Sequence, residues 1–98
     1  MDEKRALQLM QDAFDSMHRS GMLDETITVE PTTVILGSGT VLDSLGFVTF
    51  ISDMEERISA AAGQEYYLIL TEIHEYNAEE AFLSAGTLAR YIEKISGQ

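Results

Sequence analysis

The sequence predicts an all-α fold, a small four-helix bundle of three main helices and one short helix, with a long loop between the first two helices. Apolar residues recur at three- and four-residue steps in several stretches of the chain, and helix caps or stops border these stretches. The chain has 98 residues, of which 45% are hydrophobic and one is proline. This composition is typical of a folded chain with one modest core. We therefore expect a single domain over residues 1–98.

The first predicted helix covers residues 2–18, and its apolar stripe consists of Leu7, Met10, Phe14 and Met17. Gly21 predicts the end of this helix. Charged residues interrupt the apolar pattern of this stretch, so we do not expect a secretory signal. No run of the sequence reaches the length and apolarity needed to span a membrane. We expect a soluble cytoplasmic protein.

A long connection follows, over residues 22–42, which is rich in threonine, glycine and β-branched residues. Its segment TITVEPTTVIL alternates weakly between polar and apolar residues, as a strand does, but no partner strand is evident nearby. We interpret the connection as an ordered loop across the helix ends that buries Val34, Ile35, Leu36 and Leu42.

The second predicted helix begins at the sequence DSLG and runs to about Ala61, with Gly63 near its end. Asp43 is the expected N-cap, because its carboxylate can accept hydrogen bonds from the free N–H groups of the first turn. The next residue, Ser44, is either part of a plain cap or a hydroxyl that another protein modifies. The buried stripe of this helix is expected to contain Phe47, Phe50 or Ile51, Met54 and Ile58.

The last third of the chain is less regular. The apolar cluster YYLIL, residues 66–70, is either a short strand-like segment or an extension across the core. Asn77 is the expected cap of a short third helix, AEEAFL, over residues 78–83. Thr87 is the expected cap of the last helix, residues 88–95, whose inward side chains are Leu88, Ile92 and Ile95.

Charge is the strongest compositional feature. Seventeen acids against six bases give a formal charge of −11, and twelve of the acids lie between Asp24 and Glu80, where Arg57 is the only arginine or lysine. Such a field repels nucleic acid and anionic lipid, and it attracts basic protein surfaces. A solvated acidic surface that keeps the protein soluble is the alternative interpretation.

The sequence argues against catalysis and metal binding. It contains no cysteine, so neither a disulfide nor a thiolate site is available. No G-x-S-x-G motif surrounds Ser44, and the two histidines, His18 and His74, have no recognisable triad context. The acids do not have the spacing of an EF-hand loop, and there are no histidine pairs at ligand spacing. We expect no catalytic residue and no metal site.

Two motifs carry a resemblance to a known family. LDSLGFVTFISDMEERI, residues 42–58, resembles the modification-site helix of the acyl carrier protein and phosphopantetheine-carrier family, whose hallmark is Asp-Ser-Leu at the start of the second helix. AFLSAGTLARYIEKI, residues 81–95, resembles the family's ending, in which a short helix leads through a Ser/Thr-containing turn into the last helix. The predicted helices also follow the family's order over essentially the whole chain.

The resemblance implies a carrier and not an enzyme. A separate phosphopantetheinyl transferase would attach a 4′-phosphopantetheine arm to Ser44, and the thiol of the arm would carry acyl intermediates as thioesters. Asp43 matches the aspartate that the family associates with the transferase's metal-dependent site, and Leu45 would be an apolar partner contact. The resemblance also implies acids that dock on basic patches of loading and acyl-using enzymes. The candidate partner contacts on this helix are Val48, Asp53, Glu55 and Glu56.

Several positions depart from the fatty-acid carriers. Val41 replaces a frequent glycine, and Thr49 stands five residues after the serine, where an acid is frequent. We therefore expect a specialised monomeric carrier of fatty-acid, lipid or polyketide-type biosynthesis. Two alternatives remain open: a peptidyl or aminoacyl carrier, and an unmodified acidic helical module that binds other proteins and in which DSL is only a cap.

Overall fold

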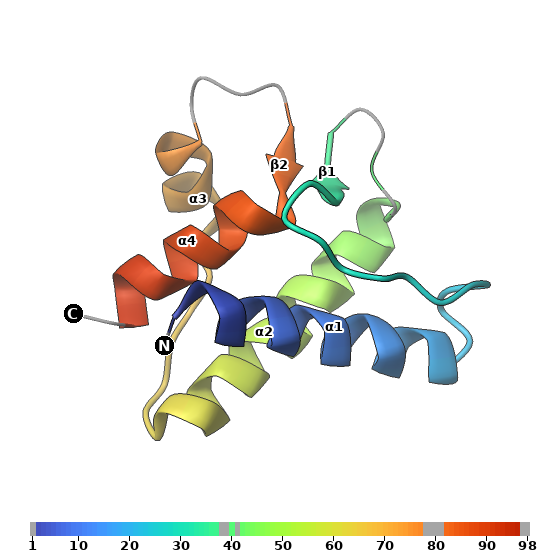
Figure 1. Cartoon of the computed structure of the whole chain (residues 1–98), viewed down its shortest axis with the longest axis horizontal. Coiled ribbons are helices and arrows are strands. Elements are labelled where there is room, and N and C mark those ends of the chain that lie inside the picture. The colour runs from blue at the N-terminus through green and yellow to red at the C-terminus, as the bar shows by residue number, and fades with distance from the viewer. Residues whose placement is uncertain (1, 38–39, 41, 78–81, 97–98) are drawn as a thin grey trace.

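The computed structural model describes residues 2–37, 40, 42–77 and 82–96, apart from the Leu70 side chain, and shows a mostly helical chain with a small two-stranded sheet (Figure 1). The predominantly helical fold expected from the sequence is confirmed, whereas the sheet was not expected. The elements are α1 (Glu3–Arg19), β1 (Val34–Leu36), α2 (Ser44–Ala62), α3 (Leu70–Tyr76), β2 (Leu83–Ser84) and α4 (Ala85–Ser96).

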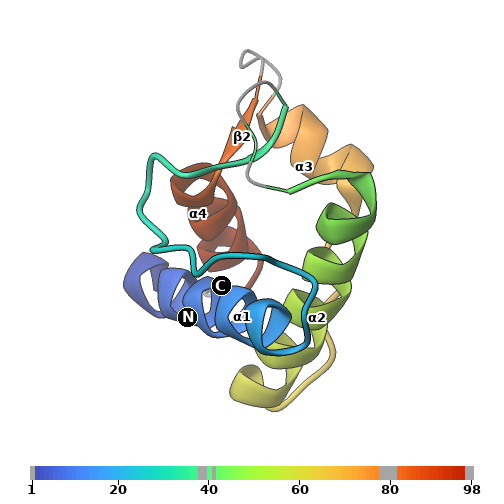
Figure 2. The same cartoon turned by 90° about the vertical axis from the view of Figure 1, so that its right-hand side faces the viewer.

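The helices enclose one core. Helix α1 packs against both α2 and α4 (Figure 2), and α3 contacts α4 (Figure 1). The rings of Phe14 on α1 and Phe50 on α2 stack with centroids 4.8 Å apart, which joins the two longest helices at the centre. The largest fully buried side chains are Met10, Phe14, Ile35, Phe50, Met54, Ile58, Leu88 and Ile92. No helix in the described part of the chain is long and apolar enough to cross a membrane.

The predicted stripes of the two long helices are largely confirmed. Met10, Phe14 and Met17 of α1 are buried, and Leu7 is half-buried against the core. In α2 both Phe50 and Ile51 are buried, together with Phe47, Met54 and Ile58. The expected ends of α2 are also confirmed. Asp43 is the N-cap, and Gly63 ends the helix with a left-handed φ of 76°, a conformation that glycine adopts without steric cost.

The connection between α1 and α2 differs from the predicted loop, because it contains a strand. β1 pairs antiparallel with β2, which lies far along the chain, so the local sequence around β1 does not reveal its partner. Ile35 and Leu42 are buried as expected. Val34 is only half-buried and Leu36 is 45% exposed, because successive residues of a strand point to opposite faces.

The short third helix lies earlier than predicted. Residues 66–69 form an extended segment, and α3 begins at Leu70. Asn77 is therefore the C-cap of α3 and not an N-cap. Residues 78–81 of the predicted helix lie outside the described residues, and Leu83 belongs to β2. The last helix starts at Ala85, where the Ser84 hydroxyl accepts a hydrogen bond from the Thr87 N–H at 3.2 Å. Ser84, and not Thr87, thus takes the capping role.

Leu88 and Ile92 of α4 are buried as predicted, and Ile95 is half-buried against the core. The start of α4 also holds the α1–α2 connection. The N–H groups of Ala85 and Gly86 donate to the carbonyl oxygens of Thr33 at 2.7 Å and Pro31 at 2.9 Å. A Cβ atom at Gly86 would lie 2.9 Å from that Pro31 oxygen, so this close approach needs glycine.

Candidate functional site at the start of α2

Ser44 is the first residue of α2, and it is exposed. The preceding residue, Asp43, caps the helix: its carboxylate accepts from the Gly46 N–H at 2.7 Å, and its carbonyl oxygen accepts from the Phe47 N–H at 2.8 Å. Among the hydrogen bonds between described residues, none involves the Ser44 hydroxyl. The cap is therefore made by Asp43, and the Ser44 hydroxyl is not needed for it.

The backbone around Ser44 suits an anion. The first turn of a helix leaves N–H groups without intrahelical partners, and the helix dipole places roughly half a positive charge at this end. Asp43 accepts hydrogen bonds from the N–H groups of Gly46 and Phe47. The N–H groups of Ser44 and Leu45 precede these in the first turn and donate no hydrogen bond among the described residues. The buried Gly46 keeps the turn tight, because a Cβ atom there would lie 3.0 Å from an Asp43 carboxylate oxygen.

Two apolar side chains are exposed on α2 beside Ser44. Leu45 is 69% exposed and Val48 is 57% exposed, values far above those of the buried stripe. Ser44, Val48, Ser52 and Glu56 are all exposed and follow one another at four-residue steps, so they share one side of the helix. Met54 lies in the core, as expected, and Val48 is available to a partner.

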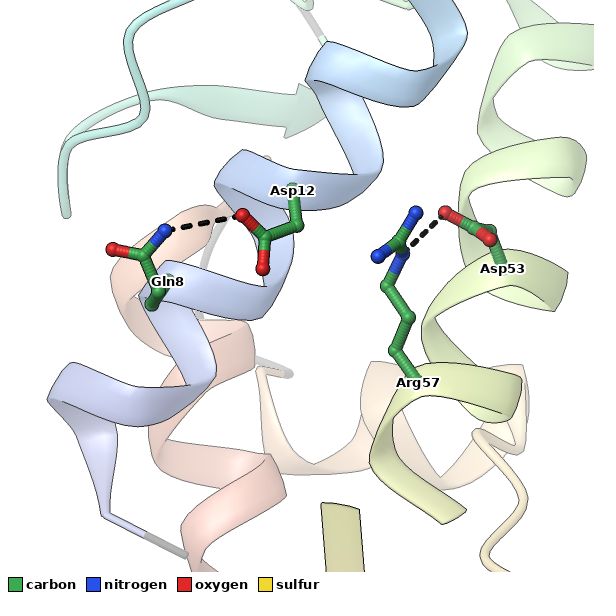
Figure 3. A network of polar contacts seen from close by, with 4 residues as sticks. All are labelled: Gln8, Asp12, Asp53 and Arg57. Atoms are coloured by element: carbon green, nitrogen blue, oxygen red, sulfur yellow. Dashed lines mark hydrogen bonds and ion pairs between the residues drawn. The ribbon is translucent and has the colours of Figure 1, made fainter. Parts of the chain in front are cut away.

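The three acids expected to dock on partners have different surroundings. Asp53 forms an ion pair with Arg57 at 2.8 Å on the same helix (Figure 3). A Glu55 carboxylate oxygen accepts from the Leu68 N–H at 2.9 Å and thereby ties the extended segment 66–69 to α2. Glu56 is exposed. Asp53 and Glu55 thus have contacts within the chain, and Glu56 lies about 18 Å along the helix from Ser44 at 1.5 Å per residue.

A surface groove lies between the start of α2 and the first part of the α1–α2 connection. It has a volume of about 650 Å³, and Asp43 and Gly46 belong to its lining. The opposite wall comes from the first part of the α1–α2 connection. The lining residues are Met22, Leu23, Asp24, Glu25, Thr26, Ile27, Leu42, Asp43 and Gly46. The lining combines apolar side chains with three acids.

Helix α1 holds the outer wall of this groove. The Gln11 side-chain amide donates to the Ile27 carbonyl oxygen at 2.7 Å and accepts from the Val29 N–H at 2.8 Å. A ring nitrogen of His18 lies 3.1 Å from the Leu23 carbonyl oxygen. These contacts fix an otherwise irregular segment against a rigid helix.

The sequence pattern does not predict the groove residues. Asp24 and Glu25 are two of seventeen acids, and nothing in their spacing distinguishes them. The only usable signal was the polar residue Gln11, next to the apolar stripe of α1, where an amide can bind a backbone segment. The structural role of Glu55 was missed for a similar reason, since its partner Leu68 lies thirteen residues away.

The arrangement presents the Ser44 hydroxyl, exposed, at the first residue of α2. In the described part of the chain, no cluster of three or more His, Asp or Glu side chains is arranged to hold a metal ion. Comparison with family models, with curated proteins and with solved structures finds no match for this chain. The assignment of Ser44 as a phosphopantetheine site therefore stays a prediction.

Proposed function

We propose that this protein is an acyl carrier of acyl-carrier-protein type, a helical bundle that bears a 4′-phosphopantetheine arm on Ser44. The observation that carries the proposal is the division of work between two neighbours. Asp43 makes the helix cap, and Ser44 presents an exposed hydroxyl at the helix N-terminus, with no hydrogen bond among the described residues. The Asp-Ser-Leu motif and the order of the long helices support the same proposal.

The modification would be a transfer performed by a phosphopantetheinyl transferase. The Ser44 oxygen attacks the phosphorus atom that bears the pantetheine arm of coenzyme A, and the bond from that phosphorus to the adenosine bisphosphate leaving group breaks. The transferase removes the hydroxyl proton. The product phosphodiester is an anion, which the N–H groups and dipole at the start of α2 stabilise. When bound, the arm supplies a thiol that carries the acyl group as a thioester.

The chain's own residues would position this site and present it to partners. Asp43 fixes the first turn, and Leu45 and Val48 offer apolar contacts beside the serine. The loading and acyl-using enzymes would bring basic patches to the acidic surface, and the protein would act as a monomer in the cytoplasm. Its charge of −11 favours such encounters and makes them dependent on salt.

Intact-protein mass tests the proposal. The chain is incubated with coenzyme A, magnesium and a promiscuous phosphopantetheinyl transferase, and its mass is measured before and after. Two variants accompany it: Ser44→Ala, and Ser52→Ala as a matched control, because Ser52 is also exposed on the same side of α2. We expect one phosphopantetheine on the wild type and on Ser52→Ala, and none on Ser44→Ala.

Two results would contradict the proposal. The first is an unchanged mass with several transferases, when circular dichroism shows that the chain is folded. The second is a mass gain that persists in Ser44→Ala. An unmodified chain would leave Asp-Ser-Leu as a helix cap and would favour the acidic interaction module. A loaded carrier would then be offered fatty-acyl and aminoacyl groups, to separate an acyl carrier from a peptidyl or aminoacyl carrier.

A further inference from the structure

We propose that the groove between the α1–α2 connection and the start of α2 is the docking site of the enzyme that modifies Ser44, and that it receives a segment carrying basic and apolar side chains. The proposal rests on the proposed function and adds to it the surface and the chemistry of the partner. It differs from the sequence expectation, which placed the docking acids on α2, at Asp53, Glu55 and Glu56.

Position is the first argument. Asp43 and Gly46 line the groove, and Ser44 lies between them in the sequence. An enzyme segment in the groove would therefore be held next to the hydroxyl that reacts. The groove has a volume of about 650 Å³ and is partly open to solvent, so a segment of another protein can reach it. The groove is also built by specific contacts, since Gln11 and His18 hold its outer wall to α1.

Charge is the second argument. Asp24, Glu25 and Asp43 line the groove, and its described lining contains no base. The Asp43 carboxylate is engaged in the helix cap. Among hydrogen bonds and ion pairs between described residues, none involves the side chains of Asp24 and Glu25, and both residues are exposed. These two carboxylates are thus available to a lysine or arginine of the partner.

The acids of α2 are less suited to this role. Asp53 is paired with Arg57, and Glu55 accepts a hydrogen bond from the Leu68 backbone. Glu56 is exposed but about three turns further along the helix than Ser44. Asp24 and Glu25, by contrast, line the same groove as Asp43, the residue before Ser44.

Apolar contacts complete the proposed site. Leu23, Ile27 and Leu42 line the groove, and Met22, which is 39% exposed, stands at its edge. A leucine or methionine next to the partner's basic residue would pack on these side chains. The exposed carboxylates of Asp24 and Glu25 disfavour an anion inside the groove and favour a cationic side chain of a partner. The combination fits a basic, apolar protein segment better than the carrier's own arm.

Kinetics of the transferase reaction test the proposal. The double variant Asp24→Asn/Glu25→Gln removes the two available charges with little change in shape, and Glu56→Gln removes one exposed charge from α2 as the control. We expect kcat/KM of the double variant to fall about tenfold at low salt, mostly through KM, because steering of the encounter is lost. The difference in kcat/KM between the double variant and the wild type should shrink at high salt. The kcat/KM of Glu56→Gln should stay within about twofold of the wild-type value. Met22→Ala should also raise KM.

Nuclear magnetic resonance gives a readout besides activity. The transferase without coenzyme A is added to the isotopically labelled chain, and we expect amide shifts at residues 22–27 and 42–46, with smaller shifts at residues 53–56. The modified chain alone is recorded as well. Shifts of the groove amides on modification alone, without further change on adding transferase, would show that the arm occupies the groove and would overturn the proposal.

The remaining outcomes are distinguishable. If the wild type is modified but the double variant reacts equally fast, docking in the groove is wrong and the carrier function stands. If Glu56→Gln loses as much as the double variant, the docking charge lies on α2 and the groove proposal is wrong. If the folded wild type is not modified by any transferase, the carrier function fails, and the docking proposal fails with it.

Discussion

The two halves of α2 use their polar side chains in different ways. At the N-terminal half, Ser44 is exposed and free of hydrogen bonds among the described residues, and Leu45 and Val48 expose apolar surface. At the C-terminal half, Asp53 pairs with Arg57 and Glu55 binds the Leu68 backbone. Ser59 exchanges hydrogen bonds with the N–H and carbonyl groups of Tyr66, at 2.9 and 3.3 Å.

This difference shows that an acid on a surface helix is not automatically available to a partner. The segment from Glu65 to Ile69 belongs to no helix and makes no described strand pairing, so its backbone groups need other partners. Glu55 and Ser59 provide them. The C-terminal half of α2 is therefore a support for the chain that follows, whereas the N-terminal half is open to other molecules.

Removing the Glu55 carboxylate is expected to have the largest effect on stability. Glu55→Ala leaves the partly buried Leu68 N–H without its charged acceptor, which should lower the free energy of unfolding by about 1–2 kcal/mol. The neighbouring variant Glu56→Ala should change it by less than about 0.5 kcal/mol. Urea denaturation of both variants measures the difference. Equal stabilities would mean that Glu55 is a solvated acid like Glu56.

Removing the cap of α2 tests the N-terminal half. Asp43→Ala should cost about 1 kcal/mol, because the Gly46 N–H loses its acceptor, while Asp43→Asn should retain most of the stability. Ser44→Ala should stay within about 0.5 kcal/mol of wild type. A large loss for Ser44→Ala in thermal or urea unfolding would show that its hydroxyl has a structural role, and that Asp43 alone does not make the helix cap.

Breaking the ion pair on α2 should have a smaller effect. Asp53 and Arg57 are spaced four residues apart and are 27% and 28% exposed at their side chains. Asp53→Ala should therefore cost about 0.3–0.5 kcal/mol at low salt, and less at high salt. Unfolding at two salt concentrations measures this. An effect that is independent of salt would point to packing and not to charge.

The smallest expected effect is a change in the titration of Tyr67. Its hydroxyl donates to a Glu65 carboxylate oxygen at 2.9 Å. This hydrogen bond, the charge of Glu65, burial and the charge of Glu55 raise the pKa of Tyr67 above its ordinary value of 10.0. The pKa rises because loss of the proton would place a negative phenolate beside carboxylates of like charge. Glu65→Gln should lower this pKa, as measured by ultraviolet absorbance of tyrosinate.

The variant Tyr67→Phe identifies which part of that titration belongs to Tyr67. Glu55→Gln should lower the same pKa by a smaller amount, because the charge of Glu55 is the weakest of the causes. An unchanged titration in both acid variants would mean that the segment after α2 does not hold Tyr67 beside these carboxylates.

The sequence predicted the parts of the fold that depend on neighbours along the chain. The periodic apolar positions of α1 and α2 led directly to Phe14, Phe50 and Met54 in the core. Asp43 and Gly63 were recognised as helix ends because capping involves residues three or four positions apart. The exposed position of Ser44 at the start of α2 follows from the same local rules.

The remaining features depend on residues far apart in the sequence. The pairing of β1 with β2, the binding of Leu68 by Glu55 and the clamp of Gln11 on the α1–α2 connection each join separate segments. A periodic pattern contains no information on such pairs. The position of the third helix was predicted wrongly for a local reason. Asparagine is common at both ends of helices, so Asn77 was expected at the start of a helix whereas it lies at the end of α3.

The sequence by itself determined where the long helices lie, which faces they bury and where the candidate serine is placed. These properties arise from hydrogen bonds and side-chain spacing within a few residues. Only the tertiary structure decided which acids are free and which are bound, and that a groove forms beside Ser44. Those properties depend on backbone groups of distant segments finding partners as the chain becomes compact.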